Sequence, residues 1–279
     1  GAGEIMIAIG LVVGSEQFGA LIQLSGLFSI LGILRKFKAP YIFYLILLSS
    51  PVLIFFISSI KPQLFSICTS VFVFALIFFK KNNKDNFDYY HKKKLILIIS
   101  LLFLSTQIKF SFVLSAFLLI VFLILENLKI KKVLQLFKII LPLYFIIIFP
   151  SIIWKYNNFG GNFIELFYSP FETSLYGLKF FKYYLTGLSE SNIYWFIFPT
   201  SIGNITHSLG LGSLMIFYIF NLKRNIQKYY ILFMIFLFIL ISYYFGQFTA
   251  RFMFEPYLWI TVYLVRFHKE FNISKYYKY

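Results

Sequence analysis

Three observations in the sequence predict an all-α protein, a polytopic bundle of transmembrane helices. Of the 279 residues, 60% are hydrophobic and 13% are charged, whereas soluble domains are about half apolar and about a quarter charged. The apolar residues gather in runs whose lengths approach what is needed to cross a bilayer core of about 30 Å. Short basic clusters separate these runs. We expect residues 1–279 to form a single transmembrane domain of about nine spans, incomplete at its N-terminus.

The best-defined pair of apolar runs covers residues 41–57 and 64–79. The short segment between them contains Lys61, Pro62 and Gln63. Proline fixes its own φ and disfavours helix at the residue before it, so we expect a tight turn here. The two runs are therefore predicted to form antiparallel helices.

The other runs differ in how well they fit a membrane span. Residues 18–34 are long enough, whereas residues 4–13 are too short and contain Glu4, which favours an interfacial or incomplete segment. Residues 95–104 cannot cross the core alone at a rise of about 1.5 Å per residue. We expect them to meet a second helix, 110–125, at a polar turn, with one long helix as the alternative. The remaining predicted spans are 139–154, kinked at Pro142 and Pro150, then 209–222, 230–245 and 254–265.

Residues 155–204 form the longest stretch without a convincing span, and we expect an extracytoplasmic loop rich in aromatic residues. Within it, residues 175–185 combine aromatic side chains with two lysines three residues apart, a pattern typical of a helix lying in the membrane interface. The loop also contains Asn162 and Tyr168. Amide and aromatic side chains of this kind suit a sugar ligand, and an ordinary aromatic belt is the alternative.

The distribution of basic residues predicts the orientation. With loops assigned alternately to the two sides, twenty of the 26 lysine and arginine residues fall on one side and six on the other. The positive-inside rule places the twenty, and the C-terminus, in the cytoplasm. Because these residues lie in short clusters between apolar runs, they indicate topology and argue against a nucleic-acid partner. The partners expected from this pattern are membrane lipids.

The sequence contains few residues typical of metal or nucleotide chemistry. The single cysteine, Cys68, lies in an apolar run, where a small buried side chain is the usual role. The three histidines have no partner at ligand spacing, and no phosphate-binding glycine motif occurs. We therefore expect no cofactor, and nothing in the sequence supports a divalent cation.

Of the six cations on the side that is poor in positive charge, three lie near the outer end of a predicted span: Lys61, Lys109 and Arg251. Snorkelling toward the headgroups is one explanation for each of them. Ionisable groups at the hydrocarbon boundary also often mark a substrate path. Because several cations bind a phosphate best when they reach the same oxygens, we predict that at least two of the three converge on one outward-facing cavity.

Several motifs in this order resemble those of one family of membrane enzymes. They are Lys61-Pro62-Gln63-Leu64, Thr106-Gln107-Ile108-Lys109-Phe110-Ser111, Gly161-Asn162-Phe163 with Tyr168-Ser169-Pro170, and Arg251-Phe252 with Pro256. The chain thereby resembles the membrane domain of the C-type glycosyltransferases. This group depends on polyprenyl-phosphate sugars and includes bacterial aminoarabinose transferases and protein mannosyltransferases.

The resemblance implies a function at the outer face of the bacterial inner membrane. A sugar would pass from a polyprenyl phosphate to a glycan, lipid or protein acceptor, with Lys61, Lys109 and Arg251 contacting the phosphate. Gln63, Asn162 and Tyr168 would lie on the substrate side, and Gln63 stands where the family often has aspartate. Glu4 and Glu165 are the candidate catalytic carboxylates, although the family's own acidic loop would precede Gly1. A transporter or flippase of lipid-linked saccharides and a polysaccharide polymerase are the alternatives.

Overall fold

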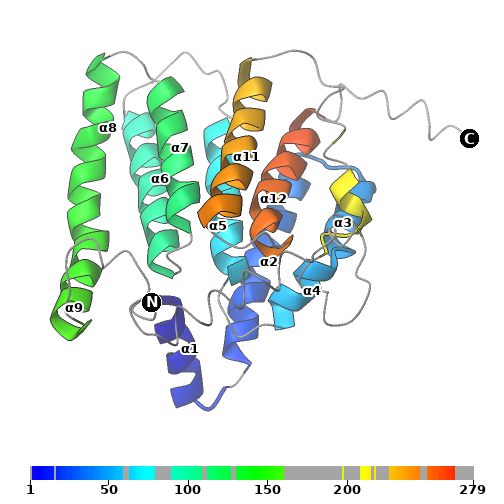
Figure 1. Cartoon of the computed structure of the whole chain (residues 1–279), viewed down its shortest axis with the longest axis horizontal. Coiled ribbons are helices and arrows are strands. Elements are labelled where there is room, and N and C mark those ends of the chain that lie inside the picture. The colour runs from blue at the N-terminus through cyan, green and yellow to red at the C-terminus, as the bar shows by residue number, and fades with distance from the viewer. Residues whose placement is uncertain are drawn as a thin grey trace, which may run out of the picture.

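The described part of the chain is a bundle of α-helices packed side by side (Figure 1). The computed structural model describes residues 2–15, 17–58, 63–78, 89–108, 112–126, 130–159, 197, 208–214, 217, 226–245 and 250–267. Within these residues no strand occurs, and the predicted all-α class is confirmed.

The elements, in chain order, are α1 (Ala2–Val12), α2 (Phe18–Lys36), α3 (Tyr41–Leu48), α4 (Pro51–Ser58), α5 (Gln63–Phe78), α6 (Tyr89–Ile108), α7 (Val113–Glu126), α8 (Ile130–Leu143), the π-helical segment η2 (Tyr144–Ile148), α9 (Phe149–Phe159), α11 (Ile226–Phe245) and α12 (Ala250–Phe267). Residues 211–214 form a 3₁₀ turn between α9 and α11.

Helices α2 and α5 run in the same direction and start at the same end of the bundle. The Gln23 Oε1 atom of α2 accepts a hydrogen bond from the backbone N–H of Phe65, in the first turn of α5, at 2.9 Å. One turn further along α2, Gly26 lies against Phe65 and Cys68 of α5. The start of α5 is thus capped by a side chain from the first third of α2, and we call this end of the bundle the near end.

Helices α7 and α12 share this direction. The first turn of α7 meets the second turn of α12 where Ser115 contacts Glu255. At the other end of the bundle, the far end, Phe122 of α7 stacks on Phe78 of α5 at 4.3 Å, and the Arg266 guanidinium lies 5.9 Å from the Phe37 ring centre. Four helices therefore start at the near end and finish at the far end.

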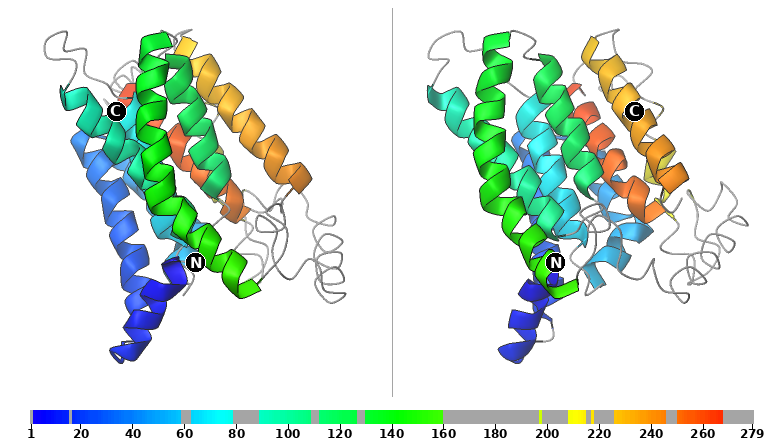
Figure 2. Two further views of the ribbon diagram at one scale, coloured as in Figure 1. Left: turned by 90° about the vertical axis from the view of Figure 1, so that its left-hand side faces the viewer. Right: turned by 60° about the vertical axis from the view of Figure 1, so that its left-hand side comes forward.

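The remaining long helices run the opposite way. Tyr230, in the second turn of α11, stacks on Phe122 at the far end, with ring centres 4.5 Å apart. Helices α11 and α12 pack together and are joined by four residues, 246–249, which at about 3.5 Å each cannot span the length of a helix. Figure 2 shows α8 and α9 as one long rod that runs from the end where α11 begins to the end where α12 begins. The far end accordingly carries the basic ends of several helices, including Arg35, Lys36 and Arg266.

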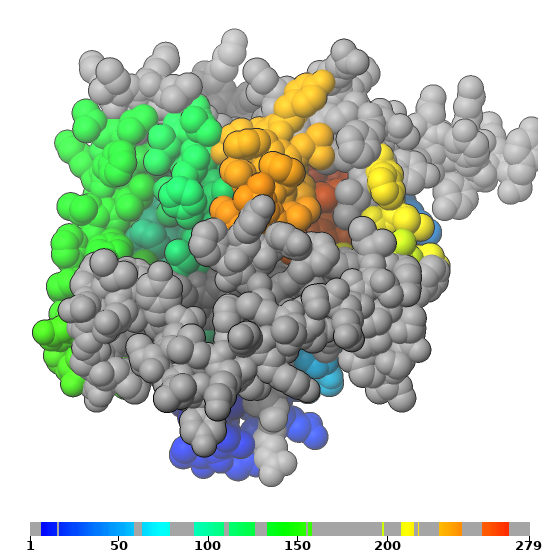
Figure 3. Space-filling model, viewed as in Figure 1, coloured from blue at the N-terminus to red at the C-terminus, as the bar shows by residue number. Residues whose placement is uncertain are grey.

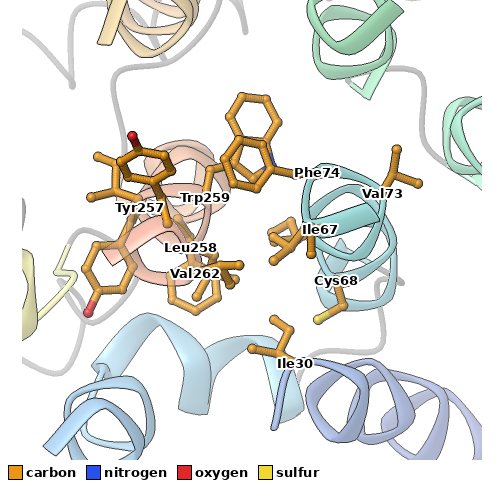
Figure 4. Close-up of a cluster of buried hydrophobic side chains, with 14 of the residues drawn as sticks. Ile30, Ile67, Cys68, Val73, Phe74, Tyr257, Leu258, Trp259 and Val262 are labelled. Carbon is orange, nitrogen blue, oxygen red and sulfur yellow. The ribbon is translucent and has the colours of Figure 1, made fainter. Parts of the chain in front are cut away.

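The core lies between α5 and its neighbours. Twelve of the sixteen residues of α5 are buried, so this helix is enclosed on nearly all sides. Figure 4 shows Phe74 and Trp259 beside each other between α5 and α12, with Ile30 of α2 facing Cys68. The Phe74 and Trp259 rings are stacked, with centres 5.7 Å apart and planes inclined by 7°.

The helices on the outer face expose apolar side chains. Helix α8 forms one edge of the face seen in Figure 3, followed across that face by α7 and then α11. Along it, Leu134, Phe137 and Leu141 are each at least half exposed. Only 6% of the most apolar part of the helical stretch Val133–Trp154 is buried. A mean hydropathy of 2.3 over this stretch suits contact with lipid chains.

Fewer helices reach full membrane length than the nine predicted spans. By length and composition, two of the described helical stretches can cross a bilayer, Phe18–Lys36 and Val133–Trp154, and α3 with α4 makes a third if the bent pair counts as one span. The predicted span 18–34 is among them. Gln63–Phe78, Val113–Leu125 and Tyr229–Ile241 are apolar but shorter.

The run 41–57 is not the continuous helix that the sequence predicts. It is broken into α3 and α4, which are bent by 61°. Pro51 has no N–H group and disfavours helix at Ser50, so the ladder is interrupted there. A segment distant in sequence supplies hydrogen-bond acceptors for the residues at the interruption. The Ser50 hydroxyl donates to the Leu209 carbonyl at 2.8 Å, and Val52 N–H donates to the Ser208 carbonyl at 3.2 Å.

Two other sequence boundaries need correction. Residues 105–108 continue α6 as helix, because the Ser105 and Thr106 hydroxyls bond to carbonyls three residues earlier and leave the ladder intact. The two predicted helices do exist there, separated by residues 109–112. Within the predicted run 209–222, residues 211–214 form a 3₁₀ turn and not a membrane helix.

The two prolines of the 139–154 span lie on either side of a π-helical segment. Pro142 and Pro150 flank η2, where Phe149 N–H donates to the Tyr144 carbonyl five residues earlier. The wider turn accommodates missing N–H groups without ending the helix. The stretch therefore stays helical to Phe159, so the predicted loop starts later than residue 155. The rest of that loop, with the interfacial helix 175–185, lies outside the described residues.

The close approach of α2 and α5 gives a test of this packing. A Cβ atom on Gly26 would lie 3.0 Å from the Phe65 Cα and 3.2 Å from the Cys68 sulfur, whereas one on Gly32 of the same helix would have no heavy atom within 4 Å. We expect Gly26→Leu to lower the free energy of unfolding by about 1–3 kcal/mol, and Gly32→Leu to leave it unchanged or raise it. Denaturant unfolding of the two variants in detergent measures this. Equal stabilities would contradict the packing.

Candidate functional site

A buried polar cluster lies where α5, α7 and α12 begin. Its centre is the Glu255 side chain, which is 4% exposed. The Ser115 hydroxyl donates to the Glu255 Oε2 atom at 2.8 Å, and Ser115 is itself buried. The Oε1 atom has no hydrogen-bond partner within the described residues. A carboxyl group in such surroundings is costly unless every oxygen is satisfied, so this atom requires explanation.

The second part of the cluster connects Glu255 to the core. One turn along α12, the Trp259 Nε1–H group donates to the Ser70 hydroxyl oxygen of α5 at 3.1 Å. The Ser70 hydroxyl lies near the Glu255 carboxyl, whose Oε1 atom has no hydrogen bond within the described residues. Hydroxyl groups from two helices thus lie beside the acid of a third. Because the Trp259 ring is stacked on Phe74, the position of this turn of α12 is fixed by packing as well as by hydrogen bonds.

The local sequence explains why Glu255 points inward near the helix start. Pro256 is the seventh residue of α12 and lies inside the helix, where it cannot donate a backbone hydrogen bond to the preceding turn. The neighbours of Glu255, Phe254 and Tyr257, are both buried, and Phe254 packs on Phe56 of α4 with ring centres 5.6 Å apart. Side chains in a helix lean toward its N-terminus, which directs the carboxyl toward the near end of the bundle.

Tyr257 occupies a second buried polar position on α12. Its hydroxyl oxygen lacks a hydrogen-bond partner among the described residues. It lies against Gly212, where an added Cβ would clash with the Tyr257 hydroxyl and with Ile46. Tyr257 therefore packs α12 against the 3₁₀ turn and the end of α3, on the side of the broken helix.

Of the residues predicted for the substrate site, Gln63 is the one whose side chain the structure describes. It is the first residue of α5 and is 6% exposed. Gln23 of α2 is fully buried beside it, bonded to Phe65 as described above. The predicted hairpin residue thus lies buried within the protein at the near end.

The other predicted site residues are located only in part. Glu4 lies in α1, and Arg251 is the second residue of α12, but their side chains are outside the described part of the structure. Five residues lie wholly outside the described residues: Lys61, Lys109, Asn162, Glu165 and Tyr168. Two of these are close in sequence to described helices: Lys61 is two residues from the start of α5, and Lys109 directly follows α6.

The sequence analysis missed Glu255, Ser115 and Ser70. The run containing Glu255 was taken to start at residue 254, so the glutamate counted as an edge residue, whereas α12 starts at Ala250 and encloses it. An ionisable residue within an apolar helix is the signal that was available. The two serines gave no signal, because serine is common in apolar helices and only the packing brings these two together.

In the described part of the chain, no three histidine, cysteine, aspartate or glutamate side chains gather as a metal site would require. Cys68 is buried against α2 and has no described polar partner. The cluster can therefore bind through one carboxyl oxygen, two hydroxyl groups and the first turns of three helices. That set accepts a hydrogen bond from a cation at Oε1 and favours anions beyond the helix starts.

Comparison with known proteins gives one match. The family model of the DUF1420 N-terminal domain covers residues 1–276 of the chain. No curated protein and no solved structure matches it significantly. With the family model spanning almost the entire length, the chain belongs to the DUF1420 N-terminal domain family.

Proposed function

We propose that this chain is the membrane domain of a glycosyltransferase that takes a sugar from a polyprenyl-phosphate donor at the outer face of the bacterial inner membrane, with several passes through the bilayer and a cytoplasmic C-terminus. The acceptor would be a glycan, a lipid or a protein. The support comes from the motifs quoted in the sequence and from the arrangement of helix starts at the near end.

One observation carries the proposal. Helices α5, α7 and α12 run in the same direction and meet in their first halves, at the eighth residue of α5 (Ser70), the third of α7 (Ser115) and the sixth of α12 (Glu255). Each start lies close in sequence to one of the outer cations. Lys61 is two residues before α5, Lys109 is four residues before α7, and Arg251 is within α12. At about 3.5 Å per residue, these distances along the chain keep all three backbones near one end of the bundle.

This end suits a phosphate for two reasons. The unpaired N–H groups and the dipoles of several helix starts favour a negative charge. Basic side chains close to them would add charge-assisted hydrogen bonds. The far end also has helix starts, those of α8 and α11, but the basic Arg35 and Lys36 lie there in the last turn of α2, where the helix end favours cations and not anions.

The reaction would be a displacement at the anomeric carbon of the donor sugar. The acceptor hydroxyl forms a bond to that carbon and gives its proton to a carboxylate acting as base. The bond between carbon and phosphate oxygen breaks, and the polyprenyl phosphate leaves with the electron pair. Lys61, Lys109 and Arg251 would stabilise the charge that develops on the leaving phosphate. Glu4 and Glu165 remain the candidate bases.

The proposal is tested by turnover of a labelled donor. The chain, reconstituted in lipid, should convert a polyprenyl-phosphate sugar to polyprenyl phosphate in the presence of a membrane acceptor extract. A variant with Lys61→Ala and Lys109→Ala should lose this turnover, while Lys36→Ala at the far end should keep it. A donor that stays intact under all acceptors would contradict the proposal.

A second candidate rests on the broken helix pair. Discontinuous helices often line the sites of transporters. Helices α3 and α4 are bent by 61° relative to each other where the helix is interrupted. A flippase of lipid-linked saccharides would move the labelled donor between leaflets without breaking the sugar–phosphate bond. Movement without cleavage in the same reconstituted vesicles would favour this candidate over the transferase.

A further inference from the structure

The bend between α3 and α4 is bound by a segment distant in sequence, residues 208–214, which we call the strap. Figure 1 shows the strap, in yellow, beside α3. It accepts two hydrogen bonds at the bend. The Ser50 hydroxyl donates to the Leu209 carbonyl at 2.8 Å, and Val52 N–H donates to the Ser208 carbonyl at 3.2 Å. All four of these residues are buried, so water does not compete for the two bonds.

Two glycines of the strap fit closely against the bend. Gly210 has a φ of +81°, and a Cβ atom there would lie 3.1 Å from the Pro51 Cδ atom. A Cβ atom on Gly212 would overlap Ile46 of α3 and the Tyr257 hydroxyl of α12. The strap therefore lies between α3 and α12, and it approaches them this closely because neither glycine carries a side chain.

The hydrogen bonds at the bend can be exchanged for those of one continuous helix. In an unbroken helix the Val52 N–H group would donate to the Leu48 carbonyl, four residues earlier. The Ser50 hydroxyl would bond to a carbonyl of the preceding turn, as serine side chains do in helices. Pro51 imposes a kink but has no N–H group to leave unpaired. Both arrangements satisfy the same donors, so the packing of the strap decides between them.

Joining α3 and α4 requires a small movement. Ser49 keeps a right-handed helical conformation, with φ −81° and ψ −3°, and α4 begins at Pro51, so Ser50 is the residue that leaves the helix. At a rise of about 1.5 Å per residue, residues 41–58 span about 25 Å in one helix and about 22 Å when bent by 61°. The ends separate by only about 3 Å. Four residues connect the pair to α2 and four to α5, which is enough chain to follow this change.

We propose that residues 208–214 are a releasable strap: while the strap is in place α3 and α4 are bent, and when it withdraws they join into one span. The joined pair is long and apolar enough to cross a membrane. Release also removes Gly212 from beside the Tyr257 hydroxyl, two residues along α12 from Glu255. The bend therefore adjoins the candidate functional site. Neither arrangement requires a ligand, so the inference does not depend on the proposed function.

The distance between spin labels at the two ends of the pair tests the strap. The labels are attached to Tyr41→Cys and Ser58→Cys, both exposed positions, in a full chain that carries Cys68→Ala and is placed in lipid nanodiscs. Without further changes we expect the shorter distance of the bent pair. Gly212→Leu should displace the strap and lengthen the main distance by about 3 Å. Ser50→Ala removes one of the two bonds to the strap and should add the longer distance as a second population.

Matched variants separate release of the strap from a general disturbance. Gly32→Leu makes the same change on α2 where a Cβ atom has no heavy atom within 4 Å, and Ser49→Ala removes a hydroxyl that bonds within its own helix. Both should keep the shorter distance. If Gly212→Leu does not fold, Gly210→Val replaces it. Its control is Gly14→Val, because Gly14 has a similar φ of +79° and no heavy atom within 4 Å of its Cβ position.

Three results would overturn the strap. The first is the shorter distance alone in the strap variant and in Ser50→Ala alike. The second is an equal lengthening in a control variant, because the bend would then not depend on the strap. The third is a broad distribution with no maximum at the longer distance, since α3 and α4 would then lose helical structure and not join.

Discussion

Replacing Trp259 by alanine will lower the free energy of unfolding by about 3–5 kcal/mol, the largest stability loss that we expect from a single substitution. The side chain is fully buried and packs between three helices. It stacks on Phe74 of α5 and meets Phe238 of α11 edge-on, with ring centres 5.9 Å apart. Alanine would leave a cavity at the centre of the bundle and remove the donor to Ser70.

Matched variants separate the sources of this loss. Trp154 is 58% exposed on the outer face of α9, so Trp154→Ala should change the unfolding free energy by less than about 1 kcal/mol. Trp259→Phe keeps a ring for stacking but loses the hydrogen bond to Ser70, and we expect an intermediate loss. Denaturant titrations followed by circular dichroism give all three values. If Trp154→Ala were as damaging as Trp259→Ala, the buried core described here would be wrong.

The class of fold and the positions of most helices follow from the sequence, because the apolar runs are long and basic segments separate them. Helix α2 occupies the predicted run 18–34 and extends it by two residues into its basic end. Helix α5 begins and ends within one residue of the predicted run 64–79. The two helices around residues 105–113 were predicted as well, although α6 runs further than expected at both of its ends. Hydrophobicity fixes where a helix exists more reliably than where it ends.

The break between α3 and α4 shows what hydrophobicity cannot predict. The run 41–57 is continuously apolar apart from its serines, and Pro51 at its middle was compatible with a mild kink. What turns the kink into a break is a contact distant in sequence. Ser208 and Leu209 provide carbonyl acceptors for Val52 N–H and the Ser50 hydroxyl. No local pattern encodes a partner 159 residues away.

The starts of α5, α7 and α12 lie near one another, whereas the convergence of Lys61, Lys109 and Arg251 stays a prediction, because their side chains lie outside the described residues. The buried acid was missed because Glu255 stands at the edge of a predicted span. Its neighbours in space come from two other helices, and only the packing of Trp259 and Phe74 fixes that arrangement.

The second large effect that we expect concerns the three outer cations. Substituting alanine for Lys61, Lys109 or Arg251 should each weaken binding of a polyprenyl phosphate by roughly tenfold or more, because each removes charge-assisted hydrogen bonds to the same oxygens. Removing two of them should weaken it further. Lys36→Ala takes an equal charge from the far end, in the last turn of α2, and should have little effect. This contrast separates a local phosphate site from a general loss of positive charge.

The most direct test of a phosphate site at the near end is a photo-crosslinking map. A polyprenyl phosphate with a photoreactive group next to its phosphate is incubated with the reconstituted protein, irradiated, and the labelled peptides are identified by mass spectrometry. We predict labels in peptides around the starts of α5, α7 and α12, which are lost in the variant with Lys61→Ala and Lys109→Ala and retained in Lys36→Ala. Labels concentrated around the ends of α2 and α12, near Phe37 and Arg266, would contradict the account.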